Sequence, residues 1–291
     1  MHWKPGELTA AFNSFLWFTG AYFTLHGVCA VLHSIYVHYG GFRDYKRRLR
    51  SFGDWAVITG VSRGIGKEFA EQFAELGFNL ILVGRQPMTK TDALAKKLTQ
   101  DHLIKCETVT VNFESSDPSN LDGLKAALKG RNVGILINNA GAITDSPDYF
   151  WNFSEKDILR MINVNCSTTT IITRTVINEV FIPRNKGLIV FMSSLSSNIT
   201  NSLMSVYSAT KAYVSSLSNA ISTELCGTGI YCTNLIPSFI CTDMVKYSDV
   251  LMRPSIVCPT AETYVRSAIK TLGVTRQTTG YYFHNLQVQF N

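Results

Sequence analysis

Tyr207 and Lys211 are four positions apart in a stretch with helical spacing of its apolar residues, Ser205–Cys226. This spacing places both side chains on one face of a helix. A lysine cation beside a phenol favours the phenolate, so we expect Lys211 to lower the pKa of Tyr207. The pair would then be an acid or base usable near neutral pH. The same spacing also occurs on solvated helix faces, so the pair acquires meaning only with other residues.

Two serines, Ser193 and Ser194, end the strand-like run Gly187–Ser193 and precede the helix that carries Tyr207. A serine hydroxyl at this point could reach the same substrate oxygen as the tyrosine. A serine that merely closes a strand-end turn is the alternative interpretation.

A glycine-rich segment, Thr59 to Gly66, directly follows an apolar strand-like run and opens a helical pattern. Glycines at such a turn let backbone N–H groups approach a pyrophosphate, which the start of a helix also favours electrostatically. A second short segment, Asn138-Asn139-Ala140-Gly141, ends another strand-like run. Ligands bind outside the carboxyl ends of strands in open α/β sheets, so both segments are candidate cofactor contacts.

The elements that must position these residues alternate along the chain. Strand-like runs occupy Trp55–Gly60, Asn79–Arg85, Cys106–Phe113, Val133–Asn138, Gly187–Ser193 and Ile230–Pro237, with Gly280–His284 as a further candidate. Helical patterns occupy Gly64–Leu76, Thr89–Asp101, Pro118–Lys129, Ser154–Phe181, Ser205–Cys226 and Thr260–Leu272. Because the strands are nearly continuous apolar runs, both sheet faces should be covered. We therefore predict an α/β fold with a Rossmann-type, doubly wound parallel sheet.

The end of the second strand-like run carries Arg85 and no acid. Sites that prefer NAD place an acid near this point to hold the ribose 2′-hydroxyl. With Arg63 in the glycine-rich segment, two guanidinium groups are available for a 2′-phosphate, which favours NADP(H). Each arginine alone could equally be a surface residue.

Taken together, these motifs resemble the classical short-chain dehydrogenase/reductase family over about residues 54–284. The resemblance implies a catalytic set of Ser194, Tyr207, Lys211 and Asn165, because the family's serine lies thirteen positions before its tyrosine. Asn165 would hold a water that links Lys211 to solvent, and Lys211 would also hold the nicotinamide ribose. The implied cofactor contacts are Gly60, Ser62, Arg63, Gly64, Ile65, Gly66, Arg85, Asn112, Asn139, Ala140, Gly141, Tyr207, Lys211, Pro237, Ile240 and Thr242.

Within this family the chain is similar to the 17β-hydroxysteroid dehydrogenase type 3 and type 12 branch, which includes the very-long-chain 3-oxoacyl-CoA reductases. The residues that carry this similarity are Trp55–Gly60, Tyr207–Lys211, Ser267–Gly273, Thr279–Tyr281 and His284. Inactive relatives of this branch lack the catalytic tyrosine, whereas Tyr207 is present. Two features depart from the branch: Asn112 stands where an aspartate is common, and the chain ends at Asn291, before the apolar and basic tail of many members. We therefore expect this chain to lack part of the segment that covers the substrate or contacts the membrane in those members.

The N-terminal segment is separate in composition. No Asp, Glu, Lys or Arg occurs from Leu8 to Phe42, and its most apolar part is Phe12–Tyr39. A membrane helix is the main prediction and a helix lying in the membrane interface is the alternative. We accordingly divide the chain into an anchor with a basic linker, residues 1–50, and an NADP(H)-binding domain, residues 51–291.

The net charge of +6 is concentrated in Arg43–Arg50, which contributes +4. This argues against a nucleic-acid partner, which would need a basic stripe on the folded domain. Basic residues directly after a membrane segment predict that the domain faces the cytoplasm, as expected for the endoplasmic reticulum membrane. The seven cysteines include no C-x-x-C pair and no ligand-like cluster, so we expect reduced thiols and no metal.

The sequence thus predicts a membrane-anchored NADP(H)-dependent oxidoreductase that interconverts a ketone and a secondary alcohol on a hydrophobic substrate. A 17β-hydroxysteroid and a long-chain 3-oxoacyl-CoA remain open as substrates, with a mobile substrate loop expected at Met244–Cys258. The alternative is a catalytically silent binding or scaffold protein on the membrane. Homodimerisation is left open.

Overall fold

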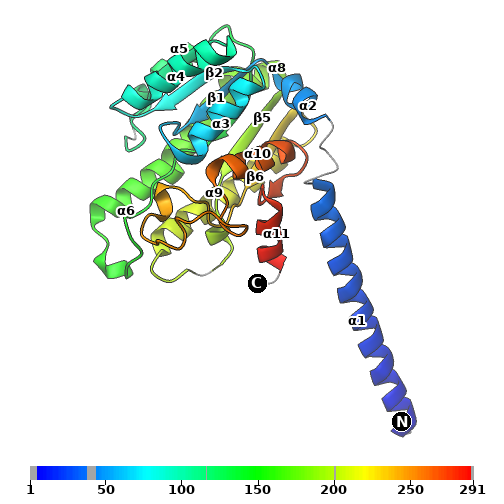
Figure 1. Cartoon of the computed structure of the whole chain (residues 1–291). Helices are drawn as coiled ribbons and strands as arrows, with labels where there is room; N and C mark the ends of the chain where they lie inside the picture. The colour runs from blue at the N-terminus through cyan, green and yellow to red at the C-terminus, as the bar shows by residue number, and fades with distance from the viewer. Residues whose placement is uncertain (1–4, 38–43, 116, 200, 290–291) are drawn as a thin grey trace.

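The computed structural model describes residues 5–37, 44–115, 117–199 and 201–289. Parts of the expected anchor and basic linker, residues 1–4 and 38–43, lie outside the described residues. Seven parallel strands form one sheet in the order β3-β2-β1-β4-β5-β6-β7 (Figure 1). Their bounds are β1 Trp55–Thr59, β2 Asn79–Gly84, β3 Cys106–Thr110, β4 Val133–Asn138, β5 Gly187–Met192, β6 Ile230–Leu235 and β7 Gln277–Thr278.

Helices cover both faces of this sheet, as the apolar strands require. Apolar side chains of α2, α3, α4 and α10 pack on one face, and those of α5, α7 and α9 pack on the other. The helices are α1 Pro5–Ile35, α2 Tyr45–Phe52, α3 Gly64–Glu75, α4 Thr89–His102, α5 Asp122–Leu128, α6 Glu155–Ile162, α7 Thr169–Val176, α8 Ile182–Arg184, α9 Ser205–Glu224, α10 Ala261–Thr271 and α11 Tyr282–Gln289. The predicted Rossmann-type fold is confirmed.

The strand order reverses between β1 and β4, which are neighbours although β2 and β3 separate them in sequence. The crevice outside their carboxyl ends is where doubly wound sheets bind ligands. The glycine-rich segment follows β1 and the Asn139–Gly141 segment follows β4. The fold therefore brings the two candidate cofactor segments to the same crevice.

The expected strand at Gly280–His284 is wrong. The seventh strand is β7, two residues long, and Tyr282 already begins α11. Gly280 has a φ of +74°, a left-handed conformation that ends the extended backbone. A side chain at this position would also lie 2.9 Å from the Tyr264 hydroxyl, so the turn needs glycine.

The predicted helix Ser154–Phe181 is present but not uniform. Between α6 and α7 the backbone forms a π-helical segment, Asn163–Thr168, and a second one, Ile177–Phe181, follows α7. Such segments insert an extra residue into the helical repeat and often accompany functional positions. Asn165 lies within the first of them.

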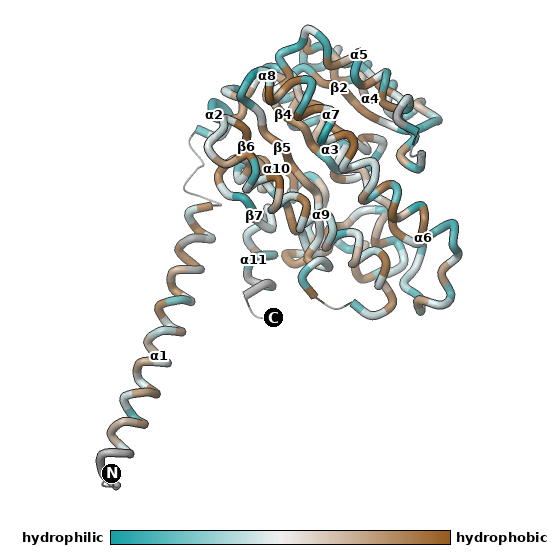
Figure 2. Tube along the Cα trace, turned by 180° about the vertical axis from the view of Figure 1, so that it is seen from behind, coloured by the Kyte–Doolittle hydropathy of each residue, from teal (hydrophilic) through white to brown (hydrophobic). Residues whose placement is uncertain are grey.

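The N-terminal segment forms the 31-residue helix α1, which extends away from the sheet domain (Figures 1 and 2). Most of its apolar side chains are exposed, Trp17 and Phe18 at 80% and 78%. Asn285 of α11 donates a 3.0 Å hydrogen bond to Ser34 near the end of α1. Within the described residues, no helix combines the length and apolar character needed to cross a membrane.

The basic run is more than a linker. Its described part lies mainly in α2, whose Leu49 is fully buried in the core beneath α3 and α10. Arg48 donates hydrogen bonds to the carbonyl oxygens of Lys270 and Leu272 at 2.7 and 3.1 Å. Helix α2 is thus packed onto the sheet domain.

Candidate active site and cofactor cleft

Thr59 connects the turn after β1 to the turn after β4 through hydrogen bonds. Its hydroxyl oxygen accepts hydrogen bonds from the backbone N–H groups of Asn139 and Ala140, at 3.0 and 2.9 Å. The Asn139 side chain returns to the first turn and donates to the carbonyl oxygens of Thr59 and Gly60. A Cβ on Gly66 would lie 2.3 Å from that amide, so this position admits only glycine. Thr59 belongs to the site although its role was not expected from the sequence.

A cleft runs along this double turn. Most of the residues predicted to contact a cofactor line it, and these are Gly60, Ser62, Arg63, Gly64, Ile65, Arg85, Asn139, Ala140, Gly141 and Thr242. Gly66 packs behind them. Phe113 and Glu114 also line the cleft, whereas Asn112 does not. The Asn112 side chain instead accepts a hydrogen bond from the Glu114 backbone.

The two arginines expected to hold a phosphate, Arg63 and Arg85, both line the cleft. Arg63 Nη1 is 2.8 Å from Asp243 Oδ2, and Arg85 Nη1 is 3.5 Å from Glu114 Oε1. The side chains of Arg63 and Arg85 are about two-thirds exposed, at 67% and 65%. Both guanidinium groups therefore lie on the cleft wall, each beside a carboxylate that could exchange for another anion.

A second cavity adjoins the cleft. The cleft and this cavity share six lining residues: Ile65, Asn139, Gly141, Ile143, Thr242 and Met244. The second cavity contains Ser194, Tyr207 and Lys211 together with Pro237 and Ile240 of the segment after β6. Its remaining lining is mostly apolar, from Met192, Leu195, Ile199, Met204, Phe239, Val245 and Tyr247. Three of the predicted catalytic side chains, Ser194, Tyr207 and Lys211, thus lie in an apolar cavity that adjoins the cleft.

Tyr207 hydrogen-bonds Ser194, whose hydroxyl also caps a short turn by accepting from Ser196 N at 3.2 Å. Burial raises the pKa of Tyr207 to about 12, and the Ser194 hydrogen bond opposes this rise without cancelling it. The direction is opposite to the one expected from the sequence. Removing the phenolate from water raises the pKa of Tyr207 by more than the Ser194 hydrogen bond lowers it.

Lys211 is 4% exposed, and its ammonium lies 5.7 Å from the centre of the Tyr207 ring. Nζ donates a 2.9 Å hydrogen bond to the carbonyl oxygen of Met192 at the end of β5. Burial lowers the pKa of Lys211 to about 8, and the nearby Cys166 thiol acts in the opposite direction. The lysine is therefore mostly charged at neutral pH but loses its proton more readily than an exposed lysine.

The neighbouring serine has a different place. Ser193 donates to the backbone oxygen of Lys211 at 2.7 Å and accepts from Ser215 at 2.8 Å. It joins the end of β5 to α9 and leaves Ser194 as the serine beside Tyr207.

Asn165 lies behind the cavity wall and is 1% exposed. Its Nδ2 donates to Ala142 O and Thr210 Oγ1, both at 2.9 Å, and its Oδ1 accepts from Ala142 N at 2.7 Å. A methyl group on Gly141 would lie 3.5 Å from both Asn165 Oδ1 and Lys211 Nζ, so these two atoms converge on the same point. Thr210, which was not predicted, completes this network from α9.

Residues 54–250 match the sequence model of a protein family described as short chain dehydrogenase. The matched region is more than half of the chain. The chain belongs to the short-chain dehydrogenase family. Within that family, it is 34% identical over 242 residues to human "Inactive hydroxysteroid dehydrogenase-like protein 1", covering 83% of this chain and 72% of that protein. It is also 34% identical over 241 residues to mouse "Very-long-chain 3-oxoacyl-CoA reductase", covering 82% and 75%.

Solved short-chain dehydrogenases share the fold. A short-chain dehydrogenase from Sphingobium yanoikuyae in complex with NADPH has 31% sequence identity and a TM-score of 0.65, covering 73% of this chain and 81% of its own. A bulky-bulky ketone specific alcohol dehydrogenase from Comamonas testosteroni has 28% identity and a TM-score of 0.66, covering 76% and 85%. The chain is thus related to oxidoreductases that act on CH–OH groups, and the predicted branch is confirmed.

Proposed function

We propose that this protein is an NADP(H)-dependent oxidoreductase that interconverts a ketone and a secondary alcohol on a hydrophobic substrate. One observation carries the proposal: the hydrogen-bonded pair Tyr207–Ser194 lies at the junction between the cleft along the glycine-rich turn and an apolar cavity. A substrate carbonyl held at this junction would face the pair from the apolar side.

The cleft suits a nicotinamide dinucleotide with a 2′-phosphate. Backbone turns held together by Thr59 and Asn139 can approach the pyrophosphate, and Arg63 and Arg85 can hold the phosphate at the adenosine end. Thr242, Pro237 and Ile240 would hold the nicotinamide end beside Lys211. The bound cofactor would supply hydride for reduction or accept it for oxidation.

For the reductive direction, Tyr207 is the proton donor. Its pKa of about 12 keeps the phenol protonated at neutral pH, which is the state that a donor requires. Ser194 would hydrogen-bond the same substrate oxygen and orient it as negative charge develops. The Lys211 ammonium would stabilise the phenolate left behind, since that anion forms beside a buried cation. Asn165 would place a water between Lys211 and solvent for reprotonation.

The part of the substrate that enters the second cavity is proposed to be largely apolar. Among the described residues lining the second cavity, Lys211 alone carries a charge. Burial of an apolar group there contributes about 25 cal/mol per Å². A 17β-hydroxysteroid or a long-chain 3-oxoacyl-CoA would meet this requirement, in keeping with the names of the relatives.

We also propose attachment to the endoplasmic reticulum membrane through α1, with the catalytic domain in the cytoplasm. The exposed apolar side chains of α1 surround the helix rather than forming a single stripe, so lipid would cover them more completely than a protein groove would.

The alternative, a catalytically silent binding or scaffold protein, has the inactive human relative in its favour. The deciding experiment is an NADPH-consumption assay of the purified full-length protein with ketosteroids and 3-oxoacyl-CoAs. Turnover of any of these ketones supports the enzyme. NADPH binding without turnover of any ketone would favour the alternative.

A further inference from the structure

The short segment Thr242–Tyr247, named here the lid segment, separates the cofactor cleft from the apolar cavity. Asp243 and Lys246 line the cleft, whereas Val245 and Tyr247 line the cavity. Thr242 and Met244 line both. One short turn therefore forms part of the wall of both spaces.

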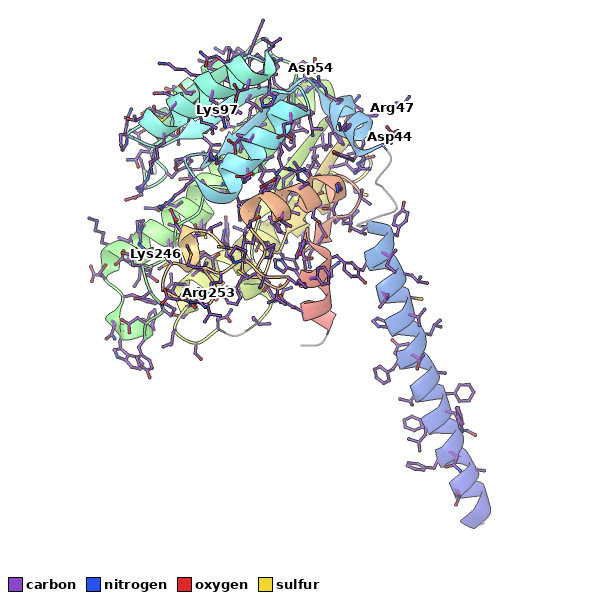
Figure 3. The ribbon with its side chains drawn as sticks, in the orientation of Figure 1. Asp44, Arg47, Asp54, Lys97, Lys246 and Arg253 are labelled. Carbon is purple, nitrogen blue, oxygen red and sulfur yellow. The ribbon has the colours of Figure 1, made fainter. Side chains whose placement is uncertain are left out.

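Two ion pairs hold the lid segment to opposite walls of the cleft. Asp243 Oδ2 lies 2.8 Å from Arg63 Nη1 in the glycine-rich turn. Lys246 Nζ lies 2.9 Å from Asp145 Oδ1 on the chain between β4 and α6, and this hydrogen bond lowers the pKa of Asp145. Figure 3 shows Lys246 on the side of the segment that faces α6.

The first of these ion pairs involves Arg63, which is also one of the two arginines proposed to bind the 2′-phosphate of the cofactor. Arg63 is 67% and Asp243 56% exposed, so water and salt weaken their attraction. A phosphate monoester carries more charge than one carboxylate and offers three acceptor oxygens to the guanidinium. A 2′-phosphate would therefore compete successfully with Asp243 for Arg63.

We propose that Asp243 makes the lid segment sensitive to the 2′-phosphate of NADP(H). When this phosphate binds Arg63, the lid segment loses its ion pair with the glycine-rich turn and keeps only the one between Lys246 and Asp145. The part of the substrate-cavity wall that this segment forms then becomes more mobile. A dinucleotide that lacks the 2′-phosphate leaves the ion pair between Arg63 and Asp243 intact. The effect is reciprocal: an untied lid segment leaves Arg63 free and strengthens binding of the phosphate. The inference rests on the proposed use of NADP(H).

Amide hydrogen exchange of the lid segment tests this coupling without turnover. The full-length protein is compared with saturating adenosine 2′,5′-bisphosphate and with saturating adenosine 5′-monophosphate, neither of which contains nicotinamide. In the wild-type protein, only the bisphosphate should speed exchange in the lid segment. In Asp243→Asn, exchange should be fast already and should not respond further. This variant should also bind the bisphosphate about two- to fivefold more tightly, the range for release of one exposed ion pair.

Two matched variants isolate the cause. Glu114→Gln frees Arg85 in the same way without touching the lid segment, so it should tighten bisphosphate binding and leave lid exchange as in the wild type. Glu262→Gln removes an exposed ion pair with Arg266 on α10 and should change neither quantity.

The coupling is contradicted if both nucleotides change lid exchange equally in the wild-type protein, or if Asp243→Asn responds as the wild type does. Arg63→Ala separates this failure from a failure of the proposed function. If Arg63→Ala binds the bisphosphate as tightly as the wild type, the phosphate assignment itself is wrong. If affinity falls in that variant while wild-type lid exchange ignores the phosphate, only the coupling is wrong.

Discussion

The Lys211 ammonium lies 5.7 Å from the centre of the Tyr207 ring and donates its hydrogen bond to the carbonyl oxygen of Met192. Burial lowers the pKa of this lysine to about 8 and raises that of the tyrosine to about 12. The lysine therefore loses its proton at a lower pH than the tyrosine does. This order determines how a reductase built on the pair should respond to pH.

Reductive kcat/KM should fall as the pH rises through about 8, because the Lys211 cation that stabilises the developing phenolate is lost there. Tyr207 remains protonated in this range. Lys211→Arg should shift the fall to higher pH, since arginine stays charged. The pH profile of ketone reduction measures this, with the exposed Lys97→Met as control. An unchanged descending limb in Lys211→Arg would assign it to another group.

Arg63→Ala combined with Arg85→Ala should abolish the preference for NADPH over NADH. Both side chains line the cleft, and their contacts with a phosphate would be charge-assisted. The KM for NADPH should rise on the order of 10- to 100-fold, while that for NADH should change little. Arg266→Ala on α10 is the control. Retained NADPH preference in the double variant would mean that other residues hold the phosphate.

His284 should make the fold sensitive to acid. It is fully buried, its Nδ1 accepts a 3.3 Å hydrogen bond from Ser238 N, and burial lowers its pKa to about 4. Between pH 6.5 and 4 the unfolded chain binds a proton that the folded chain refuses, so stability falls as the pH falls. This single group contributes up to about 3 kcal/mol to the loss.

Urea denaturation at several pH values between 7 and 4 measures this loss. His284→Asn can still accept the Ser238 hydrogen bond but cannot titrate, so its stability should depend less steeply on pH. His102→Asn, at the end of α4, is the matched control. Equal slopes for His284→Asn and wild type would show that the acid sensitivity arises elsewhere.

Three N-glycosylation sequons, beginning at Asn152, Asn165 and Asn198, report which side of a membrane the domain occupies. Asn165 is buried and cannot report, whereas Asn152 and Asn198 are exposed. If the domain is cytoplasmic, full-length protein from eukaryotic cells should migrate identically with and without an N-glycan-removing enzyme. A shift would place the domain in the lumen.

A companion chain that begins at Asp44 keeps α2, whose Leu49 belongs to the core, and removes α1. It should lose stable membrane association if α1 is the attachment. Continued tight binding would assign the attachment to another apolar surface, such as the loop containing the exposed Val250 and Ile256.

Features that depend on local sequence patterns could be predicted from the sequence alone. The apolar runs predicted six of the seven strands, and the positions of the glycine-rich and Asn139–Gly141 segments after two of these strands predicted that both segments are candidate cofactor contacts. The strand expected at Gly280–His284 was wrong because an aromatic apolar run suits a strand and a buried helix equally.

Features that depend on distant contacts could not be predicted in the same way. The pKa of Tyr207 rises because packed segments exclude water around it, and residue spacing alone does not report that burial. The π-helical turn at Asn165 and the ion pair between Arg63 and Asp243, 180 positions apart, likewise depend on the tertiary structure.

Single-turnover reduction by Tyr207→Phe tests the central assignment most directly. NADPH binding is measured first by nucleotide fluorescence, and the rate of NADPH oxidation is then followed with a ketone that the wild-type protein reduces. Phenylalanine retains the ring but removes the proton donor, so the rate should fall by about 10²- to 10⁴-fold while NADPH affinity stays the same. A Tyr207→Phe protein that binds NADPH and reduces the ketone at the wild-type rate would contradict the account.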